Sequence, residues 1–135
     1  MNKTLTIEAT LKNWNEVNEF LEDLTKNYPP EASMAIKIVV EEIFANVANY
    51  AYAPNAGLLT INVESSDSPE KITFTFIDSG IAFNPLKKSE PDFSISYEEK
   101  EVGGLGIFLL RENADEIKYG YRDGKNILSV TKFLD

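Results

Sequence analysis

Glu42 and Asn46 are the first polar residues whose spacing indicates chemistry. They stand four positions apart and interrupt an otherwise apolar helical stripe, in the segment EEIFAN at 41–46. On a helix, side chains at this spacing lie on one face, roughly 5–6 Å apart. A carboxylate beside an amide oxygen suits Mg²⁺, a hard cation that binds oxygen and keeps several waters. The alternative is that the two residues form a polar edge where the helix meets solvent, since Glu and Asn four positions apart are common on helices.

Asp78 is the second candidate. It ends the alternating segment KITFTFID at 71–78 and is followed by Ser79 and Gly80. An ionised carboxylate only accepts hydrogen bonds, so one fixed at a strand end can accept from an exocyclic amine such as that of adenine. Gly80 permits backbone torsions or a close ligand approach that a side chain would block. The alternative is an Asx-type turn that closes the strand.

A glycine cluster is the third candidate: Gly103, Gly104 and Gly106 stand just before a predicted helix. Free amides at a helix N-terminus, together with the helix dipole, form an anion site. An acidic protein could then hold phosphate with backbone groups instead of many cations. The pattern is not a P-loop, because no Gly-Lys-Ser/Thr follows, and its spacing differs from that of the dinucleotide glycines. The alternative is a flexible entry into a core helix.

Hydrophobic periodicity predicts the elements that must position these residues. Alternation predicts strands, and a period near 3.6 predicts helices. The strands fall at 4–10, 59–63, 71–78, 116–122 and 126–133, and the helices at 14–24, 31–52 and 105–114. Residues 84–102 are polar without a clear period, and a loop this long in a small domain is usually functional or mobile. The order of elements predicts one α+β domain over residues 1–135, with a mixed sheet and its helices on one face.

Composition excludes several classes of function. The chain has 135 residues, and 13 Lys and Arg against 22 Asp and Glu give a net charge of −9. An acidic surface repels phosphate backbones, so we expect no direct nucleic-acid binding. There is no Cys and no His, which excludes thiolate nucleophiles, Cys-based zinc sites, His triads and phosphohistidine relays. The apolar runs are too short to span a bilayer and the N-terminus lacks a secretory signal, so we expect a cytoplasmic protein.

The three motifs together resemble the GHKL (histidine-kinase-like) ATP-binding fold, which is found in gyrase-type ATPases, sensor histidine kinases and anti-sigma-factor serine kinases. The resemblance rests on a Glu-x-x-x-Asn helix, Asp-x-Gly-x-Ala after a strand, a long polar loop and Gly-Gly-x-Gly opening a helix. It covers roughly residues 31–133. The segment GGLGIFLLRENADEIKY at 103–119 is most similar to the anti-sigma-factor serine/threonine kinases. The resemblance implies a Bergerat-type two-layer α/β sandwich with a mostly antiparallel sheet.

The resemblance also implies roles for the helix motif and the lid. Asn46 would coordinate the Mg²⁺ that bridges the nucleotide phosphates, and Glu42 would act as general base on the attacking hydroxyl. Residues 84–102 would form the lid over ATP, where Lys87, Lys88 and Lys100 could reach phosphate or simply be solvated.

The remaining implied roles concern the base and the phosphates. Asp78 would recognise the adenine amine, with Gly80 and Ala82 lining that pocket. The glycine cluster, Gly103, Gly104 and Gly106, would hold the phosphates. Gly104 and Gly106 would donate their backbone amides to phosphate oxygens.

Several positions depart from the family pattern. Relatives often carry a basic residue or His three or four positions after the motif Asn, where this chain has Asn49 and Tyr50. Many also carry Thr right after a Gly near the adenine, where this chain has Lys125 and Asn126 after its Gly. Thr131 is a candidate substitute whose placement the sequence does not fix.

We therefore expect an ATP- and Mg²⁺-dependent protein serine/threonine kinase that acts as an anti-sigma regulatory factor. By resemblance, its partners would be a sigma factor and an antagonist (anti-anti-sigma) protein that it phosphorylates, and the chain could form a homodimer. Two alternatives remain open: a nucleotide-responsive module that binds a partner without turnover, and a domain that binds no ligand.

Overall fold

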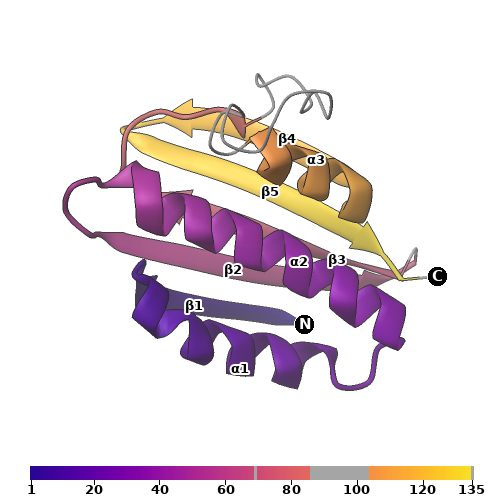
Figure 1. Cartoon of the computed structure of the whole chain (residues 1–135). Coiled ribbons are helices and arrows are strands. Elements are labelled where there is room, and N and C mark those ends of the chain that lie inside the picture. The colour runs from indigo at the N-terminus through magenta and orange to yellow at the C-terminus, as the bar shows by residue number, and fades with distance from the viewer. Residues whose placement is uncertain (69, 86–103, 135) are drawn as a thin grey trace.

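The computed structural model describes residues 1–68, 70–85 and 104–134. Five strands are found in these segments (Figure 1): β1 (Asn2–Glu8), β2 (Leu58–Asp67), β3 (Glu70–Asp78), β4 (Glu116–Arg122) and β5 (Lys125–Phe133). The α-helices are α1 (Trp14–Thr25), α2 (Pro30–Asn46) and α3 (Gly104–Asn113). A 3₁₀ turn, Leu11–Asn13, precedes α1, and a π-helical turn, Val47–Ala51, follows α2. The strands and helices predicted from periodicity are thus present, with ends shifted by a few residues.

The strands form one sheet in the order β1-β2-β3-β5-β4, and each neighbouring pair is antiparallel. Two residues, Asp123 and Gly124, join β4 to β5, and both have positive φ (55° and 74°). This left-handed backbone suits a tight hairpin, and Gly adopts it without steric cost. The register of β3 and β5 places Asp78 directly opposite Asn126.

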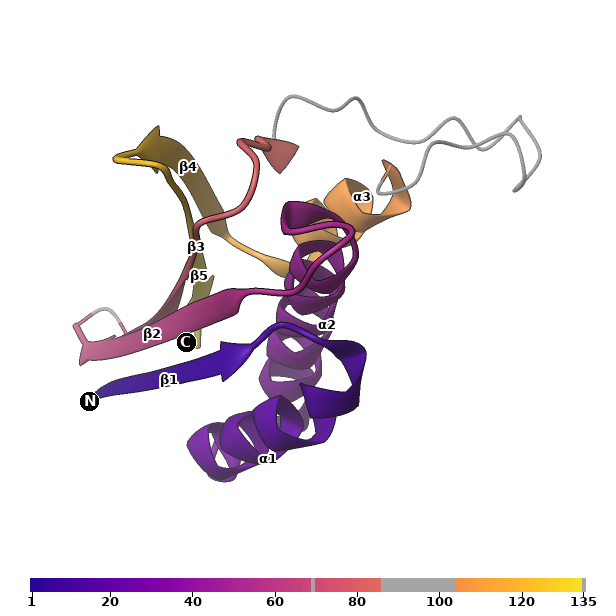
Figure 2. The same ribbon diagram turned by 90° about the vertical axis from the view of Figure 1, so that its left-hand side faces the viewer.

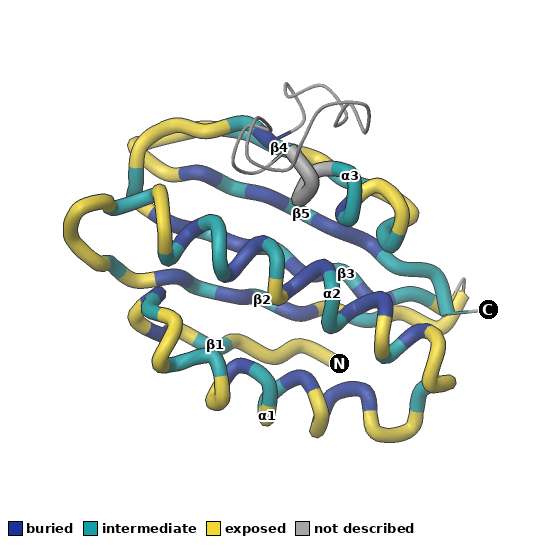
Figure 3. Tube along the Cα trace, in the orientation of Figure 1, coloured by how far each residue is buried: buried dark blue, intermediate teal, exposed yellow. Residues whose placement is uncertain are grey.

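All three α-helices cover the same face of the sheet, as Figure 2 shows. Burial alternates along the strands because successive side chains point to opposite faces (Figure 3). The face toward the helices is apolar, and the open face carries mainly Thr, Ser, Asn and charged side chains. The predicted α+β sandwich with helices on one face is therefore confirmed, whereas the sheet predicted to be mixed is antiparallel at every pair of described strands.

The core lies between the sheet and α2, which runs across the middle of the sheet. Phe44 and Val40 of α2 are buried against Ile61 and Phe76 of the sheet. Burying such side chains stabilises the fold by about 1.5–3 kcal/mol each relative to their exposed state. Leu110 of α3 belongs to the same cluster, so α3 is held beside α2. No helix among the described residues has an apolar stretch long enough to span a membrane.

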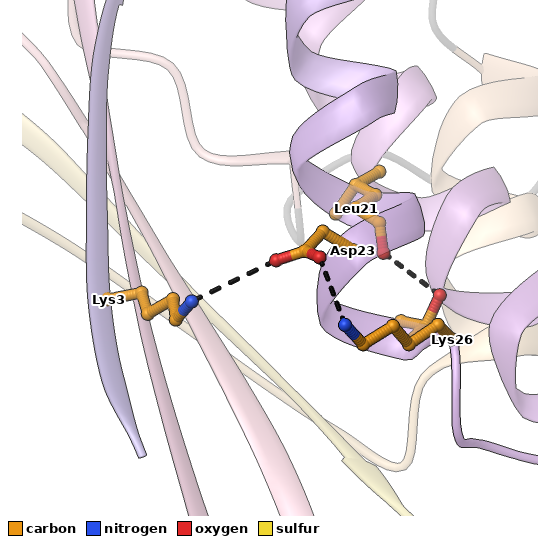
Figure 4. Close-up of polar contacts among 5 residues, drawn as sticks. Lys3, Leu21, Asp23 and Lys26 are labelled. Carbon is orange, nitrogen blue, oxygen red and sulfur yellow. Dashed lines mark hydrogen bonds and ion pairs between the residues drawn. The ribbon is translucent and has the colours of Figure 1, made fainter.

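Polar contacts between β1 and α1 lie at the edge of this core (Figure 4). Asp23 forms ion pairs with Lys3 at 3.9 Å and with Lys26 at 3.4 Å. All three side chains are at least half exposed, and exposed pairs of this kind contribute little to stability. Burial of Val17 and Leu21 holds α1 against the sheet instead.

One prediction about the central helix needs correction. The sequence predicts a continuous helix over residues 31–52, whereas regular α-helix ends at Asn46 and the next five residues, Val47–Ala51, form a π-helical turn. Apolar periodicity does not detect a change in winding over so few residues. Single π-helical turns are frequently found at functional sites.

Candidate functional site

A cavity opens between α2, its π-helical extension, α3 and the ends of β3 and β5. The space between its walls, counted together with the solvent at its mouth, is about 620 Å³. Its walls are mainly apolar and come from α2, the π-helical turn, the sheet and α3: Ile43, Val47, Phe76, Leu110 and Leu128. The polar side chains that face it among the described residues include Asn46, Asp78, Tyr119 and Asn126. Apolar walls with a few convergent polar groups are typical of small-molecule sites.

Asp78 occupies the closed end of this cavity. The apolar alternation of β3 places it on the helix-facing side, where only 7% of its surface is exposed. Its Oδ1 accepts hydrogen bonds from the Gly80 backbone N–H at 2.9 Å and from Asn126 Nδ2 at 3.0 Å. The Gly80 contact is the Asx-type turn that was the alternative interpretation of this residue. The turn leaves Oδ2 without a bond to another described residue. Asp78 can therefore close the turn through Oδ1 and still accept a hydrogen bond from a ligand through Oδ2.

Asn126 is the residue that joins this end of the site together. Its Nδ2 also donates to the Ile81 carbonyl at 2.8 Å. Its Oδ1 accepts from the Phe83 N–H at 3.1 Å and from the Tyr119 hydroxyl. The amide orientation is unambiguous, since the Ile81 carbonyl can only accept and the Phe83 N–H can only donate. All four hydrogen-bonding positions of the buried amide are therefore used.

Tyr119 contributes to the same network from β4. Burial raises the pKa of its hydroxyl, and the negative charge of Asp78 raises it further, while a hydrogen bond from the Phe83 backbone opposes this. The hydroxyl therefore keeps its proton at neutral pH and remains a donor to Asn126.

The loop that follows Asp78 is docked on the end of the π-helical turn that extends α2. Gly80 packs so closely against the Ala51 carbonyl that a Cβ atom at this position would overlap it. The Ile81 N–H donates to the same carbonyl at 2.9 Å. The Ser79 N–H donates to the Tyr52 hydroxyl at 2.7 Å. Gly80 is therefore required by the approach of the chain's own backbone.

Ala82 was expected beside Gly80 in the wall of the pocket. Ala82 is exposed, and neither residue is among those that line the cavity. Ile81 and Phe83, their neighbours in the loop, line it instead.

Glu42 and Asn46 lie one turn apart on α2, as the spacing predicts. Both are half-buried, and Asn46 lines the cavity whereas Glu42 does not. Burial raises the pKa of the Glu42 carboxyl above its usual value, and the negative charge of Glu41 adds to this effect. Within the described segments, no group of three or more acidic, His or Cys side chains could bind a metal by itself. An amide oxygen from the protein, completed by phosphate oxygens and water, is a donor set that fits Mg²⁺.

Part of the predicted phosphate site lies outside the described residues. Gly104 begins α3 and Gly106 lies in its first turn, where backbone amides have no intrahelical acceptor. Gly103, the lid beyond residue 85 and its three lysines lie in the segment 86–103, which the structure does not describe.

The positions that depart from the family pattern separate in space. Tyr50 lines the cavity from the π-helical turn, whereas Asn49 and Lys125 are exposed. Thr131, the candidate substitute, lies on the open face of the sheet, where its hydroxyl pairs with that of Thr73 at 2.8 Å. It is therefore not in the cavity, and Asn126 is the residue of β5 that faces Asp78.

The sequence indicated Asn126 only as a departure from the family pattern, without a role in the site. The signal was present as a polar residue in the apolar phase of a strand, ahead of Leu128 and Val130. Asp78 breaks the apolar phase of β3 at the same end. In an antiparallel pair, two such breaks at one end of the sheet indicate a cross-strand contact.

The chain is similar to known proteins over most of its length. Residues 7–132 match the profile of the histidine kinase-like ATPase domain. The serine/threonine-protein kinase BtrW of Bordetella bronchiseptica is 22% identical over 130 residues, which cover 95% of this chain and 91% of BtrW. The serine-protein kinase RsbW of Staphylococcus aureus is 28% identical over 102 residues, covering 73% of this chain and 64% of RsbW. The match to RsbW thus spans somewhat less than two thirds of that protein.

Proposed function

Because the chain belongs to the histidine kinase-like ATPase domain family, we propose that it binds ATP in the cavity and acts as a cytoplasmic protein serine/threonine kinase. The observation that carries the proposal is the buried Asp78 carboxylate at the closed end of an apolar cavity. A purine ring buries its faces against such walls, and its exocyclic amine donates to Asp78 Oδ2. The names of two relatives, BtrW and RsbW, support protein kinase activity.

The phosphates extend from the base toward the C-terminal end of α2 and the first turn of α3. Asn46 holds Mg²⁺ through its amide oxygen, and the amides of Gly104 and Gly106 donate to phosphate oxygens. Mg²⁺ supplies charge neutralisation on the phosphates. Phosphoryl transfer depends mainly on positioning and charge stabilisation, so few further groups are needed.

Glu42 accepts the proton of the attacking hydroxyl. The γ-phosphoryl group passes from ATP to the hydroxyl oxygen of a serine or threonine on a partner protein, and ADP leaves. A carboxyl whose pKa is raised by burial is a stronger base than a solvated one, which suits this role. Glu42 is half-buried and lies one helical turn from Asn46 on α2, so it is near the proposed metal and γ-phosphate.

The partners in this proposal follow from the resemblance to anti-sigma-factor kinases. In this proposal the protein binds a sigma factor in one state and phosphorylates an antagonist (anti-anti-sigma) protein in another. The direct test combines the protein, radiolabelled ATP, Mg²⁺ and a candidate antagonist, and measures label in the antagonist. We expect transfer with the wild type and none with Glu42→Ala, which should still bind ATP. Full transfer by Glu42→Ala would contradict the role of Glu42.

A second function is favoured by Tyr50, which lines the cavity where relatives often carry a basic residue or His. A site with fewer cations near phosphate could bind nucleotide and switch partner affinity without turnover. In the same assay this module would bind ATP and its partner but transfer no label.

A further inference from the structure

Asp78 has one saturated oxygen and one available oxygen. Each carboxylate oxygen has two lone pairs that accept hydrogen bonds. Both acceptor positions of Oδ1 are taken, by the Gly80 N–H at 2.9 Å and by Asn126 Nδ2 at 3.0 Å. Only Oδ2 is left for a ligand in the cavity. Asp78 is therefore restricted to recognition through a single oxygen.

This restriction separates the two purine bases. Adenine presents one exocyclic amine, which a single oxygen satisfies. Guanine presents two adjacent donors, N1–H and the 2-amine, and a carboxylate binds them best with both of its oxygens at once. With Oδ1 saturated, one guanine donor stays unpaired in the cavity, and an unpaired buried polar group strongly disfavours the wrong ligand.

We propose that Asn126 is a positioning residue that sets the adenine specificity of the site by saturating Asp78 Oδ1. The inference rests on the proposed nucleotide-binding function and deepens it. Asn126 is itself fixed, because its carbonyl oxygen is held by Phe83 N–H and the Tyr119 hydroxyl while its second N–H is held by Ile81. Only 6% of its surface is exposed, so solvent does not compete for these bonds.

The test compares guanosine and inosine diphosphates, which differ only in the 2-amine. Affinities are measured by displacement of a fluorescent ADP analogue. The wild type should bind ADP most tightly, and should bind GDP about tenfold more weakly than IDP, because the 2-amine of guanine finds no acceptor and stays unpaired. Asn126→Ala frees one acceptor position on Oδ1, so GDP should gain about tenfold over IDP.

The ratio of GDP to IDP affinity distinguishes positioning from a structural role, because general damage to the cavity weakens both ligands alike. Asn126→Thr keeps a hydroxyl that can donate to Oδ1, and its ratio should stay near that of the wild type. Thr131→Val is the matched control: it removes a hydrogen bond of β5 on the open face and should leave the ratio unchanged.

Two results would overturn the proposal while leaving nucleotide binding intact. One is a wild-type protein that binds GDP at least as tightly as IDP, a measurement that needs no variant. The other is a folded Asn126→Ala protein with an unchanged ratio. A wild type that binds no adenine nucleotide would overturn the proposed function, and this inference with it.

Discussion

The two ends of the cavity are built differently. At the closed end, Asp78, Asn126 and Tyr119 come from three neighbouring strands and satisfy one another through hydrogen bonds. At the other end, Asn46 lines the cavity and Glu42 lies one helical turn away on α2; both are half-buried, and neither forms a side-chain hydrogen bond with another described residue. A closed network is pre-organised before any ligand arrives, whereas an open pair of oxygens is completed by a metal and phosphates. Changes at the two ends should therefore have separable effects.

Asp78→Asn should have the largest effect on binding. The Gly80 and Asn126 donors would hold the new amide with its oxygen in place of Oδ1, so its NH₂ group would replace Oδ2 and face the adenine amine. Two donors would then oppose each other, and ADP affinity should fall about 100-fold, or about 2.7 kcal/mol.

The same variant offers an internal check by calorimetry. A purine nucleotide without the amine should lose much less affinity, and an inosine nucleotide, whose O6 is an acceptor, should gain. Equal losses for all three ligands would remove Asp78 from the role of base recognition.

Gly80→Ala should destabilise the closed end by about 1–3 kcal/mol, because the added methyl group would overlap the Ala51 carbonyl. Urea unfolding measures the loss. Gly120→Ala is the matched control, since nothing lies within 4 Å of a Cβ atom there. If both variants were equally stable, the close docking of the loop on the π-helical turn would be wrong.

Asn46→Ala tests the open end. Without the amide oxygen, the gain in ATP affinity on adding Mg²⁺ should shrink about tenfold, or about 1.4 kcal/mol, while the affinity without metal stays near the wild-type value. Asn49→Ala, at an exposed position of the same helical segment, should preserve the metal effect. Calorimetry with and without EDTA gives both quantities, and a metal effect that survives Asn46→Ala would move the magnesium site elsewhere.

Glu42→Gln should change the free energy of unfolding only slightly, which is the smallest of the predicted effects. The native pKa of Glu42 is raised by burial and by Glu41, so the ionised carboxylate destabilises the folded state at neutral pH. This destabilisation disappears as pH falls through the raised pKa toward the ordinary value. The variant should thus be more stable than the wild type at pH 7, by less than about 1 kcal/mol, and the difference should vanish near pH 4. A difference that is the same at both pH values would contradict the cause given for the shift.

The sequence predicts most of this fold because its signals are local. Alternation predicts the strands, and of the two polar breaks in the central helix, Glu42 and Asn46, Asn46 lines the cavity. The features that the sequence does not predict depend on contacts between distant residues or on a local change in helix geometry. Asn126 acts through Asp78, 48 positions away, and Gly80 is required by Ala51 from another element. The π-helical turn after Asn46 leaves no periodic signal.

The central claim is that the cavity binds an adenine nucleotide through Asp78 and a metal through Asn46. Calorimetric titration of the wild type with ADP and ATP, each with Mg²⁺ and with EDTA, tests it most directly. We predict saturable binding of both nucleotides in EDTA and about tenfold tighter binding of ATP when Mg²⁺ is present. Absence of heat from both nucleotides under both conditions would contradict the account.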